Sequence, residues 1–335
     1  MADLRVAVIG CGSHAQEHFG QIAADSRLHL AAIADIDALR LERNRVQWRP
    51  EQAFAEWRRM LDVCELDLVH ICTMPGHIVP IALDCLQRDL HTSIEKPPGM
   101  SSADTEKMAE VARRSKGKDI VSFDRRYIPE VLAVRRMVEE RGGPVHCATT
   151  YNKNVDLIGS RAWAHITPEA ILCDGIHHVD LLRWLAGRTL PEAARPTAVY
   201  AEVEDGERDA TNRQNAVVRF DSGAIGVLMN HAGVGIRIRR AEVHAEDFSV
   251  YLDLPPGEAT YELYEAVDLG PGEPNRGAPY EGELDLEPTG GPDFNETRHF
   301  VDCILEDQTP WSSLDDAVHT MRLAEEIRRG HKGEV

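Results

Sequence analysis

The stretch VAVIGCGSHAQEHF, residues 6–19, decides the fold of this chain, and two motifs overlap inside it. Gly10, Gly12 and Ala15 fit the G-x-G-x-x-G/A turn that holds a dinucleotide. In such a turn Gly10 permits the tight bend, Gly12 lets the backbone approach the pyrophosphate, and Ala15 keeps the helix close to the strand. Residues 14–18 also fit H-x-x-E-H, a zinc-peptidase pattern. The two motifs need different surroundings, so the neighbouring sequence distinguishes them.

A dinucleotide turn needs a strand before it, a helix after it and an acid at the end of the next strand. LRVAVIG (4–10) predicts the strand and SHAQEHFGQIAA (13–24) predicts the helix, while Asp35 ends the apolar run LAAIAD. An acid at this position accepts hydrogen bonds from the ribose and repels a 2′-phosphate, which favours NAD over NADP. The alternative is an ordinary glycine-rich turn in which Asp35 only caps the next helix.

The zinc interpretation has less support. His14 and His18 are four residues apart and could share a helix face, with Glu17 as a base. The site would still need a third ligand, and no sequence pattern points to one. We therefore expect no metal site.

Composition limits the classes of function. The chain has 335 residues, enough for two domains, and a formal charge of −19. That charge argues against nucleic-acid or anionic-membrane partners, which need a basic face. The seven cysteines form no C-x-x-C, and no apolar stretch reaches the length of a membrane span or a signal peptide. We expect a reduced, cytoplasmic protein.

Short apolar runs alternate with helical patterns over the first 125 residues. The apolar runs lack a period of two, as strands buried on both faces do. This alternation predicts a doubly wound parallel sheet with helices on both faces. The runs are 4–10, 28–35, 66–73, 90–96 and 119–124, and the helical patterns are 14–24, 36–46, 76–88 and 102–116.

After about residue 145, strand patterns follow one another and predict a mostly antiparallel sheet. One strong helix, residues 174–187, interrupts them, with Asp174 as a possible N-cap and Gly187 as its stop. The Gly- and Pro-rich acidic segment 255–293 is interpreted as a solvated loop without assigned chemistry. Two helical patterns, 294–307 and 314–330, close the chain.

At EKPPGMSSAD the sequence resembles a known family, that of glucose–fructose oxidoreductase and inositol dehydrogenase (Gfo/Idh/MocA). The similar segments run in order from residue 4 to about residue 329, and the E-K-P step is the most specific of them. They are VAVIGCGSHA, IADID, ICTMPGH, IEKPPGMS, SFDRRYIPE, DGIHHVDLLRWLAG and HFVDCILEDQTPWSSLDDAVHTMRLAEEIRR.

The resemblance implies an N-terminal NAD-binding Rossmann domain, residues 1–122, and a C-terminal α/β domain with an open sheet, residues 123–335. It implies that the last helices, about 293–329, return toward the first domain. The implied activity is an NAD-dependent dehydrogenase acting on a sugar or cyclitol bound between the domains, in a homo-oligomer. Two alternatives stay open: a reductase of another acceptor, such as a keto-sugar or a biliverdin-like compound, and a non-catalytic NAD-dependent sensor.

The resemblance places catalytic groups after the fourth strand and at the start of helix 174–187. Lys96 matches the E-K-P lysine, where an ammonium could hold the substrate hydroxyl. The acid/base histidine aligns with His177, but the position of its aspartate then falls on Cys173 rather than Asp174. Three interpretations remain: His177 is the base oriented by Asp174, His178 is the base, or Asp174 only caps the helix.

Further site residues come from the family and complete the prediction. Two departures concern the substrate pocket: PEAIL stands where the family has Gly-Gly, and Ile78 replaces a frequent histidine, with His77 beside it. The implied cofactor contacts besides Gly10, Gly12 and Asp35 are Cys11, Ser13, His14, Ile36, Thr73, Met74, Pro75, Glu95 and Lys96. The implied substrate contacts are Asp124, Arg126, Tyr127, Trp163 and His177.

Overall fold

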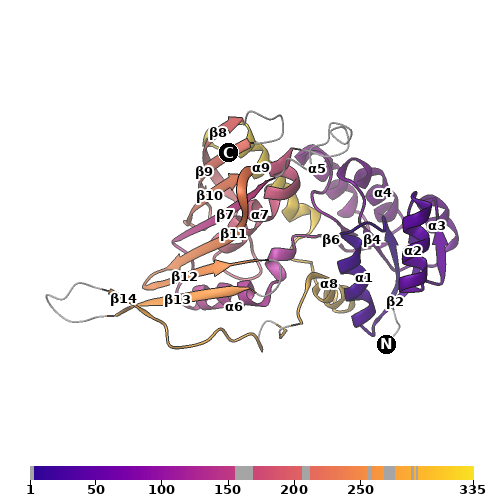
Figure 1. Ribbon diagram of the computed structural model, residues 1–335, viewed down its shortest axis with the longest axis horizontal. Coiled ribbons are helices and arrows are strands. Elements are labelled where there is room, and N and C mark those ends of the chain that lie inside the picture. Colours follow the sequence, from indigo (N-terminus) through magenta and orange to yellow (C-terminus); the bar gives the residue numbers. More distant parts are fainter. Residues whose placement is uncertain are drawn as a thin grey trace. The chain divides into compact units, whose positions relative to one another are not determined.

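A computed structural model describes residues 4–154, 169–205, 212–255, 259–267, 276–287, 290–291 and 293–335 (Figure 1). Its internal contacts divide the chain into two compact units. Among the described residues, the first unit comprises residues 4–122 and Asn295–Val318, and the second comprises the remainder. Trp163, an expected substrate contact, lies outside the described residues.

The first unit is built on a six-stranded parallel sheet in the order β3-β2-β1-β4-β5-β6. Its inner strands β1 and β4 are apolar and buried, as strands covered on both faces must be. The predicted Rossmann sheet is confirmed. The strands are β1 (Leu4–Ile9), β2 (Leu28–Ala34), β3 (Gln52–Phe54), β4 (Leu68–Ile71), β5 (His91–Ile94) and β6 (Asp119–Val121).

Side-chain caps stand at the start of some helices of the first unit. Asp37 accepts hydrogen bonds from the amides of Leu39 and Arg40 at the start of α2. Ser101, one residue before the expected start, caps α5 through the amide of Asp104. The helices are α1 (Ala15–Ala24), α2 (Ala38–Trp48), α3 (Trp57–Val63), α4 (Pro75–Gln87), α5 (Ser102–Ala112) and α8 (Glu296–Leu305).

Helix α8 comes from the far end of the chain but belongs to the first unit. Asp302 pairs with Arg27 at 2.6 Å, and the Glu296 carboxylate accepts a hydrogen bond from Ser122 at 2.9 Å. The side chains of Phe300 and Val301 are fully buried. Apolar packing and ion pairs therefore both hold α8 in the Rossmann unit.

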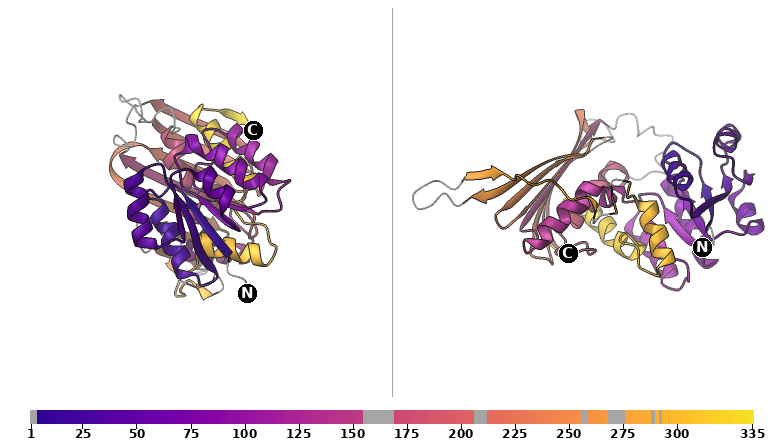
Figure 2. Two further views of the ribbon diagram at one scale, coloured as in Figure 1. Left: turned by 90° about the vertical axis from the view of Figure 1, so that its right-hand side faces the viewer. Right: turned by 90° about the horizontal axis from the view of Figure 1, so that it is seen from below.

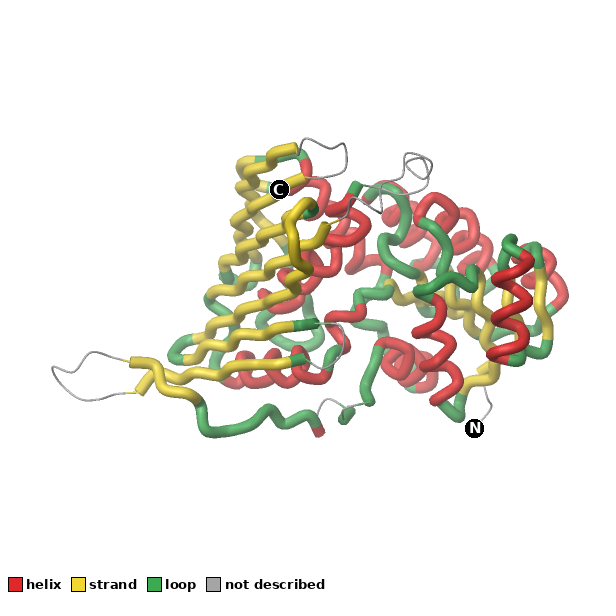
Figure 3. Tube along the Cα trace, in the orientation of Figure 1, coloured by secondary structure: helices red, strands yellow, loops and turns green. Residues whose placement is uncertain are grey.

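The second unit contains a nine-stranded sheet in the order β14-β13-β12-β11-β7-β10-β9-β8-β15 (Figure 3). All neighbouring strands pair antiparallel except β7 and β10, which pair parallel, so the predicted mostly antiparallel sheet is confirmed. The strands are β7 (His146–Asn154), β8 (Pro196–Asp205), β9 (Asn212–Phe220), β10 (Ile225–His231), β11 (Gly233–Ala245), β12 (Phe248–Asp253), β13 (Thr260–Val267), β14 (Arg276–Pro279) and β15 (Lys332–Glu334).

Helices α6 (Pro129–Glu140) and α7 (Ile176–Ala186) pack on one face of this sheet (Figure 2). A short 3-10 helix, η1 (Asp124–Tyr127), precedes α6, and a π-helical turn, η3 (Ile171–Gly175), precedes α7. Helix α9 (Leu314–Arg328) ends the helical part of the chain. No helix in the described part of the chain is both long and apolar enough to cross a membrane.

Three expectations about local structure need correction. Segment 255–293 is not loop throughout, because β13 and β14 pair with β12 and with each other inside it. Asp174 is not the N-cap of α7, since it lies within the π-helical turn and Gly175 precedes the helix. Gly187 does end α7 but with φ −64°, and a Cβ there would meet the Glu192 carbonyl oxygen at 2.0 Å.

Candidate active site

The expected cofactor residues of the first unit all follow the carboxyl ends of four adjacent strands, β2, β1, β4 and β5. The strand order reverses between β1 and β4, and ligands of open α/β sheets bind at such a switch point. After β1 come Gly10, Cys11, Gly12, Ser13 and His14; after β2, Asp35 and Ile36; after β4, Thr73, Met74 and Pro75; after β5, Glu95 and Lys96.

The glycine turn has the geometry that the motif requires. Gly10 has φ +89°, and a Cβ there would lie 2.5 Å from the carbonyl oxygen of Cys72. Only glycine fits this position. Gly12 differs, because a Cβ there would meet nothing within 4 Å, which leaves open space above its backbone. Ala15 is fully buried at the start of α1, so the helix packs closely on the sheet.

Asp35 ties the second strand to this turn. One carboxylate oxygen accepts a hydrogen bond from the Cys11 amide at 2.7 Å, and the other accepts one from the Asp37 amide at 2.8 Å. Arg40 lies 3.3 Å from the same carboxylate. Because Asp37 and not Asp35 caps α2, the position of Asp35 is not explained by helix capping alone.

The segment after β4 adds an unpartnered hydroxyl and exposed apolar groups. The Thr73 hydroxyl oxygen is buried and makes no hydrogen bond with the described residues. Pro75 begins α4, and Met74 before it is 39% exposed, while Ile36 across the sheet edge is 84% exposed. Such an edge, with a polar group beside apolar surfaces, fits a nucleoside.

Glu95 is held by a buried histidine of the opening motif. Its Oε1 lies 3.1 Å from His18 Nε2, and its Oε2 accepts a hydrogen bond from the Lys96 amide at 3.2 Å. Burial opposes protonation of His18, but Glu95 and Glu296 outweigh it and raise the pKa of His18 to about 9. His18 thus packs as a paired cation, and the described residues contain no metal-binding group of three His, Cys, Asp or Glu. The Glu95 side chain is held in this pairing, and its contact with the cofactor stays a prediction.

Two members of this buried cluster were not predicted. Glu296 Oε1 lies 3.9 Å from His18 Nδ1, and the His70 ring packs against the His18 ring with centroids 4.9 Å apart. Burial lowers the pKa of His70 well below its usual value, so it stays neutral beside the cation. One signal for this cluster was present in the sequence, because His70 and Glu296 are polar residues inside apolar patterns.

In the second unit, His177 is paired with a carboxylate. Its Nδ1 lies 2.9 Å from Asp124 Oδ1, and the two side chains are 13% and 33% exposed. Asp124 comes from η1, whereas His177 stands in the first turn of α7. The structure places Asp124 on the imidazole of His177, and its predicted contact with substrate stays a prediction.

Asp174 and His177 are related by a turn that the sequence analysis did not anticipate. The spacing of Asp174 and His177 places them on one face of an α-helix with 3.6 residues per turn. Residues 171–175 instead form a π-helical turn, which is wider. The Asp174 carboxylate accepts a hydrogen bond from Lys153 Nζ at 2.8 Å.

His178 has the opposite environment to its neighbour. It is fully buried, its ring packs on Tyr151 with centroids 5.0 Å apart, and neither ring nitrogen has a partner among the described residues. Burial lowers its pKa well below the usual value. A substrate cannot reach a fully buried ring. We therefore interpret His178 as a packing residue rather than as the base.

Arg126 and Tyr127 are also corrected. The Arg126 guanidinium is fully buried and donates to both carboxylate oxygens of Asp180 at 2.5 and 2.7 Å. Tyr127 is 2% exposed and packs near Phe294. Both side chains therefore serve the interior of the second unit rather than a substrate surface.

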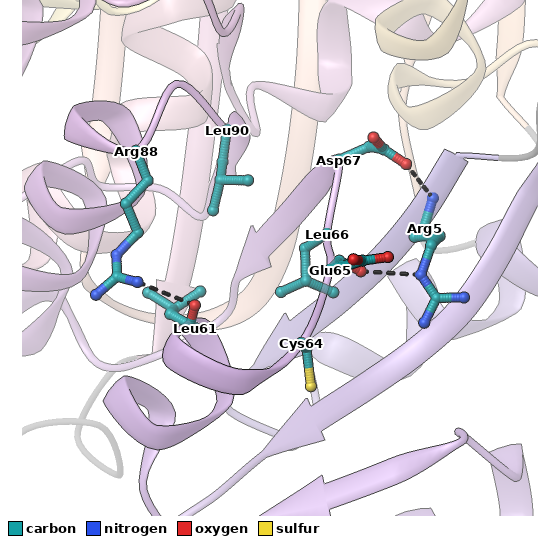
Figure 4. A pocket seen from close by; sticks show the side chains of 8 residues that line it. All are labelled: Arg5, Leu61, Cys64, Glu65, Leu66, Asp67, Arg88 and Leu90. Atoms are coloured by element: carbon teal, nitrogen blue, oxygen red, sulfur yellow. Dashed lines mark hydrogen bonds between the residues drawn. The ribbon is translucent and has the colours of Figure 1, made fainter.

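A cavity of about 460 Å³ lies at the other edge of the parallel sheet, at the amino ends of the strands (Figure 4). Its arginine side chains are already paired: Arg5 with Glu51 and the Glu65 carbonyl, and Arg88 with the Leu61 carbonyl and Asp62. It lies away from the glycine turn, and we assign it no part in cofactor binding.

Comparisons with known proteins agree with this geometry. Residues 4–123 match the family described as an oxidoreductase family with an NAD-binding Rossmann fold, Gfo/Idh/MocA. A myo-inositol 2-dehydrogenase of Thermotoga maritima is 24% identical over 234 residues, 68% of each chain. The rhizopine catabolism protein MocA of Rhizobium meliloti is 28% identical over 222 residues, 63% of this chain and 66% of its own length.

Solved structures show the same fold over the whole chain. A levoglucosan dehydrogenase in complex with NADH and L-sorbose has a TM-score of 0.83 at 18% identity, covering 100% of this chain and 99% of its own. A UDP-N-acetylglucosamine 3-dehydrogenase from Acidithiobacillus ferrooxidans has a TM-score of 0.77 at 20% identity, covering 99% and 98%.

The fold and the glycine turn define an NAD-binding protein of the oxidoreductase class. Residues 4–123 are the NAD-binding Rossmann domain of the Gfo/Idh/MocA family, and the resemblance seen in the sequence is confirmed.

Proposed function

We propose that this protein is an NAD-dependent dehydrogenase that oxidises a secondary hydroxyl of a sugar, a sugar derivative or a cyclitol. The observation that carries the proposal is the His177–Asp124 pair in a chain whose first unit has a dinucleotide turn. The names of the relatives, which are inositol and sugar dehydrogenases, support the substrate class.

His177 is the proposed base. With Nδ1 on Asp124, Nε2 is the nitrogen that accepts the hydroxyl proton. The carboxylate fixes the tautomer and stabilises the imidazolium that forms. A histidine suits this step because its ordinary pKa, about 6.5, is close to working pH.

Lys96 is proposed to hold the reacting oxygen and to favour its alkoxide character. It follows β5, and its backbone amide is fixed by the Glu95 carboxylate. When bound, NAD supplies the hydride acceptor for this chemistry. The residues that would hold it are the turn Gly10–His14, Asp35 and the Thr73–Pro75 segment, and Asp35 favours NAD over NADP.

The decisive experiment is a substrate screen. The purified chain is mixed with NAD and a panel of cyclitols and sugars, and absorbance at 340 nm is recorded. We expect NADH to form with at least one compound. Reduction of keto-sugars or a biliverdin-like compound only would favour a reductase, and tight NAD binding without any turnover would favour a sensor.

The role of Lys96 has its own test. Lys96→Ala is expected to lower kcat by about 10²-fold or more, because a positioned cation at a developing charge is lost. The Kd for NAD should stay within about twofold, since the pyrophosphate and ribose contacts lie elsewhere. Lys116→Ala, at a side chain 90% exposed, is the control. A kcat that equals the wild-type value would contradict the proposal.

We further propose a homo-oligomer formed through the open face of the second sheet. Tyr200, Val217, Ile225, Met229 and Tyr251 are each 37–51% exposed, and the strand register places them on that face. Light scattering of the intact chain tests this.

We also propose a cytoplasmic location, supported by the absence of a disulfide among the seven cysteines, all of which are described.

A further inference from the structure

The second unit gathers cationic side chains around the His177–Asp124 pair, although the whole chain carries −19. Arg125 lies 3.4 Å from Asp124, and Lys153 pairs with Asp174. Arg237 and Arg239 on β11 add two more guanidinium groups. Arg237 donates a hydrogen bond to the hydroxyl of Tyr151, and neither arginine makes an ion pair with the described residues.

Arg239 is the most unusual of these cations. It is 8% exposed and stands at a position of β11 that faces α7, like Ala241 and Val243. Its Nε has no partner, and its guanidinium makes no ion pair or hydrogen bond with the described residues. A buried charge is normally paired, because burial removes its hydration.

Other buried arginines in the same unit make hydrogen bonds through their guanidinium groups. Arg126 pairs with Asp180, and Arg183 donates to the Thr320 hydroxyl and the Ala194 carbonyl. Arg135 donates to the carbonyls of Thr189 and Glu192, although its Nη1 has no partner among the described residues. Arg239 differs from all three, because its guanidinium makes no hydrogen bond with the described residues.

The strand register places Arg239 beside the proposed active site. Arg239 on β11 is paired with Tyr151 on β7, and the Tyr151 ring packs on the ring of His178, the neighbour of His177. Burial, followed by Arg125 and Arg237, lowers the pKa of Arg239 to about 10, so it stays charged near neutral pH. The site thus holds a fixed positive charge that makes no ion pair with the described residues, although the charge of Asp124 acts on it.

We propose that Arg239, with Arg125 and Arg237 near it, binds an oxyanion on the substrate, so that the preferred substrate is an acidic sugar or sugar phosphate rather than a neutral one. A guanidinium presents parallel N–H donors that match carboxylate and phosphate oxygens. This inference rests on the proposed function, because it names the substrate class of the same site.

Binding rather than turnover tests the inference first. Titration calorimetry of the NADH-loaded protein compares D-glucuronate, D-glucose 6-phosphate, D-glucose and myo-inositol. We expect at least one of the two anions to bind about tenfold or more tightly than the neutral compounds, and the anion preferred distinguishes carboxylate from phosphate. Equal or tighter binding of the neutral compounds would overturn the inference.

The variants Arg239→Met and Arg239→Lys locate the effect. Arg239→Met should abolish the preference for the anion and leave the Kd for NADH unchanged, and Arg239→Lys should retain part of it. Arg240→Met is the matched control, because this neighbour on β11 faces the opposite side and pairs with Asp253. Retention of the full preference by both Arg239 variants would also overturn the inference.

The outcome is separable from that of the dehydrogenase proposal. If neutral sugars reduce NAD and the two anions neither bind nor react, the anion site is wrong and the dehydrogenase stands. If anions bind through Arg239 and none of a wide panel reduces NAD, the anion site stands and the dehydrogenase is wrong.

Discussion

At the scale of single residues, His177 and His178 are neighbours in the chain with opposite surroundings. Adjacent residues of a helix diverge by about 100°, so the two rings cannot serve one reacting atom. His177 meets the Asp124 carboxylate, whereas His178 is enclosed by Tyr151 and the sheet. The chemistry is therefore assigned to one ring and the packing to the other.

This assignment predicts unequal effects of substitution. His177→Ala should lower kcat by about 10²–10⁴-fold, the usual contribution of a positioned acid/base. Asp124→Asn should give an intermediate loss, because it disturbs the tautomer of His177. His178→Phe keeps a ring in the buried space and should retain most of the activity. Steady-state kinetics with folding checked by circular dichroism measures this, and an inactive His178→Phe beside an active His177→Ala would reverse the assignment.

Asp35 makes a second prediction at this scale. NAD should bind more tightly than NADP, and Asp35→Ser should narrow that difference, because the carboxylate that repels a 2′-phosphate is gone. Affinity for NAD should fall as well, since the Cys11 amide loses its acceptor. Fluorescence titration with both cofactors gives the two Kd values. Tighter binding of NADP by the unchanged chain would contradict this account.

The placement of a residue could be predicted where its partners lie close to it in the sequence. Gly10, Gly12, Ala15 and Asp35 act within one βαβ unit, so their spacing predicts their placement. The pairing of His177 with Asp124 joins residues more than fifty positions apart and left no spacing to detect. Arg126 was misassigned for the same reason, because Asp180 is a partner only in three dimensions.

At the scale of elements, a buried ion pair joins η1 to α7. Asp180 on α7 accepts from Arg126 on η1 and from the Thr320 hydroxyl on α9. All three groups are fully buried. The pair thus fixes α7, which carries His177, to the 3-10 turn η1, which carries Asp124, and to α9.

Removing one partner of this pair should lower the stability of the folded protein. Asp180→Asn is expected to lower the free energy of unfolding by about 3–5 kcal/mol, because Arg126 stays charged and buried without a counterion. Glu42→Gln, which breaks an exposed pair with Arg45, should leave stability nearly unchanged. Urea denaturation measures both. A loss at Asp180 no larger than that at Glu42 would show that the buried pair contributes little.

Elements were predictable where local signals were strong. Strands β1, β2 and β4 are mostly apolar, and α5 has its capping serine next to an alanine-rich pattern. Three-residue β3 and seven-residue α3 are too short to show a period. Strands β13 and β14 lie in a segment whose glycines and prolines masked the alternation, and pairing with β12 overrides that composition.

At the scale of the whole molecule, the buried cluster of His18, Glu95 and Glu296 couples stability to pH. The pKa of His18 is raised to about 9 in the folded protein, above its ordinary 6.5. A group whose pKa is raised by folding stabilises the folded state. This contribution is fully present when the pH is below the pKa of the unfolded chain, and it is lost as the pH rises through the pKa of the folded protein. The relevant window is therefore between about pH 6.5 and pH 9.

His18→Gln should expose this contribution. At pH 6.5 the variant is expected to be less stable than the wild type by ~3 kcal/mol, which corresponds to the raised pKa. The difference should shrink toward pH 9.5, where His18 is neutral in both states. Urea unfolding of both proteins across this range gives the comparison. A difference that stays constant with pH would show that His18 is not a buried cation.

The Rossmann unit is completed by a segment made late in synthesis. Its first part ends at residue 122, and Asn295–Val318 follows only after the second unit's strands. At about 5–20 residues per second, a ribosome needs roughly 10–40 s to bridge that interval. Until then His18 and Glu95 lack Glu296, and the apolar surface that Phe300 and Val301 will cover is open to water. We therefore expect a fragment ending at residue 123 to be a poor unit for expression.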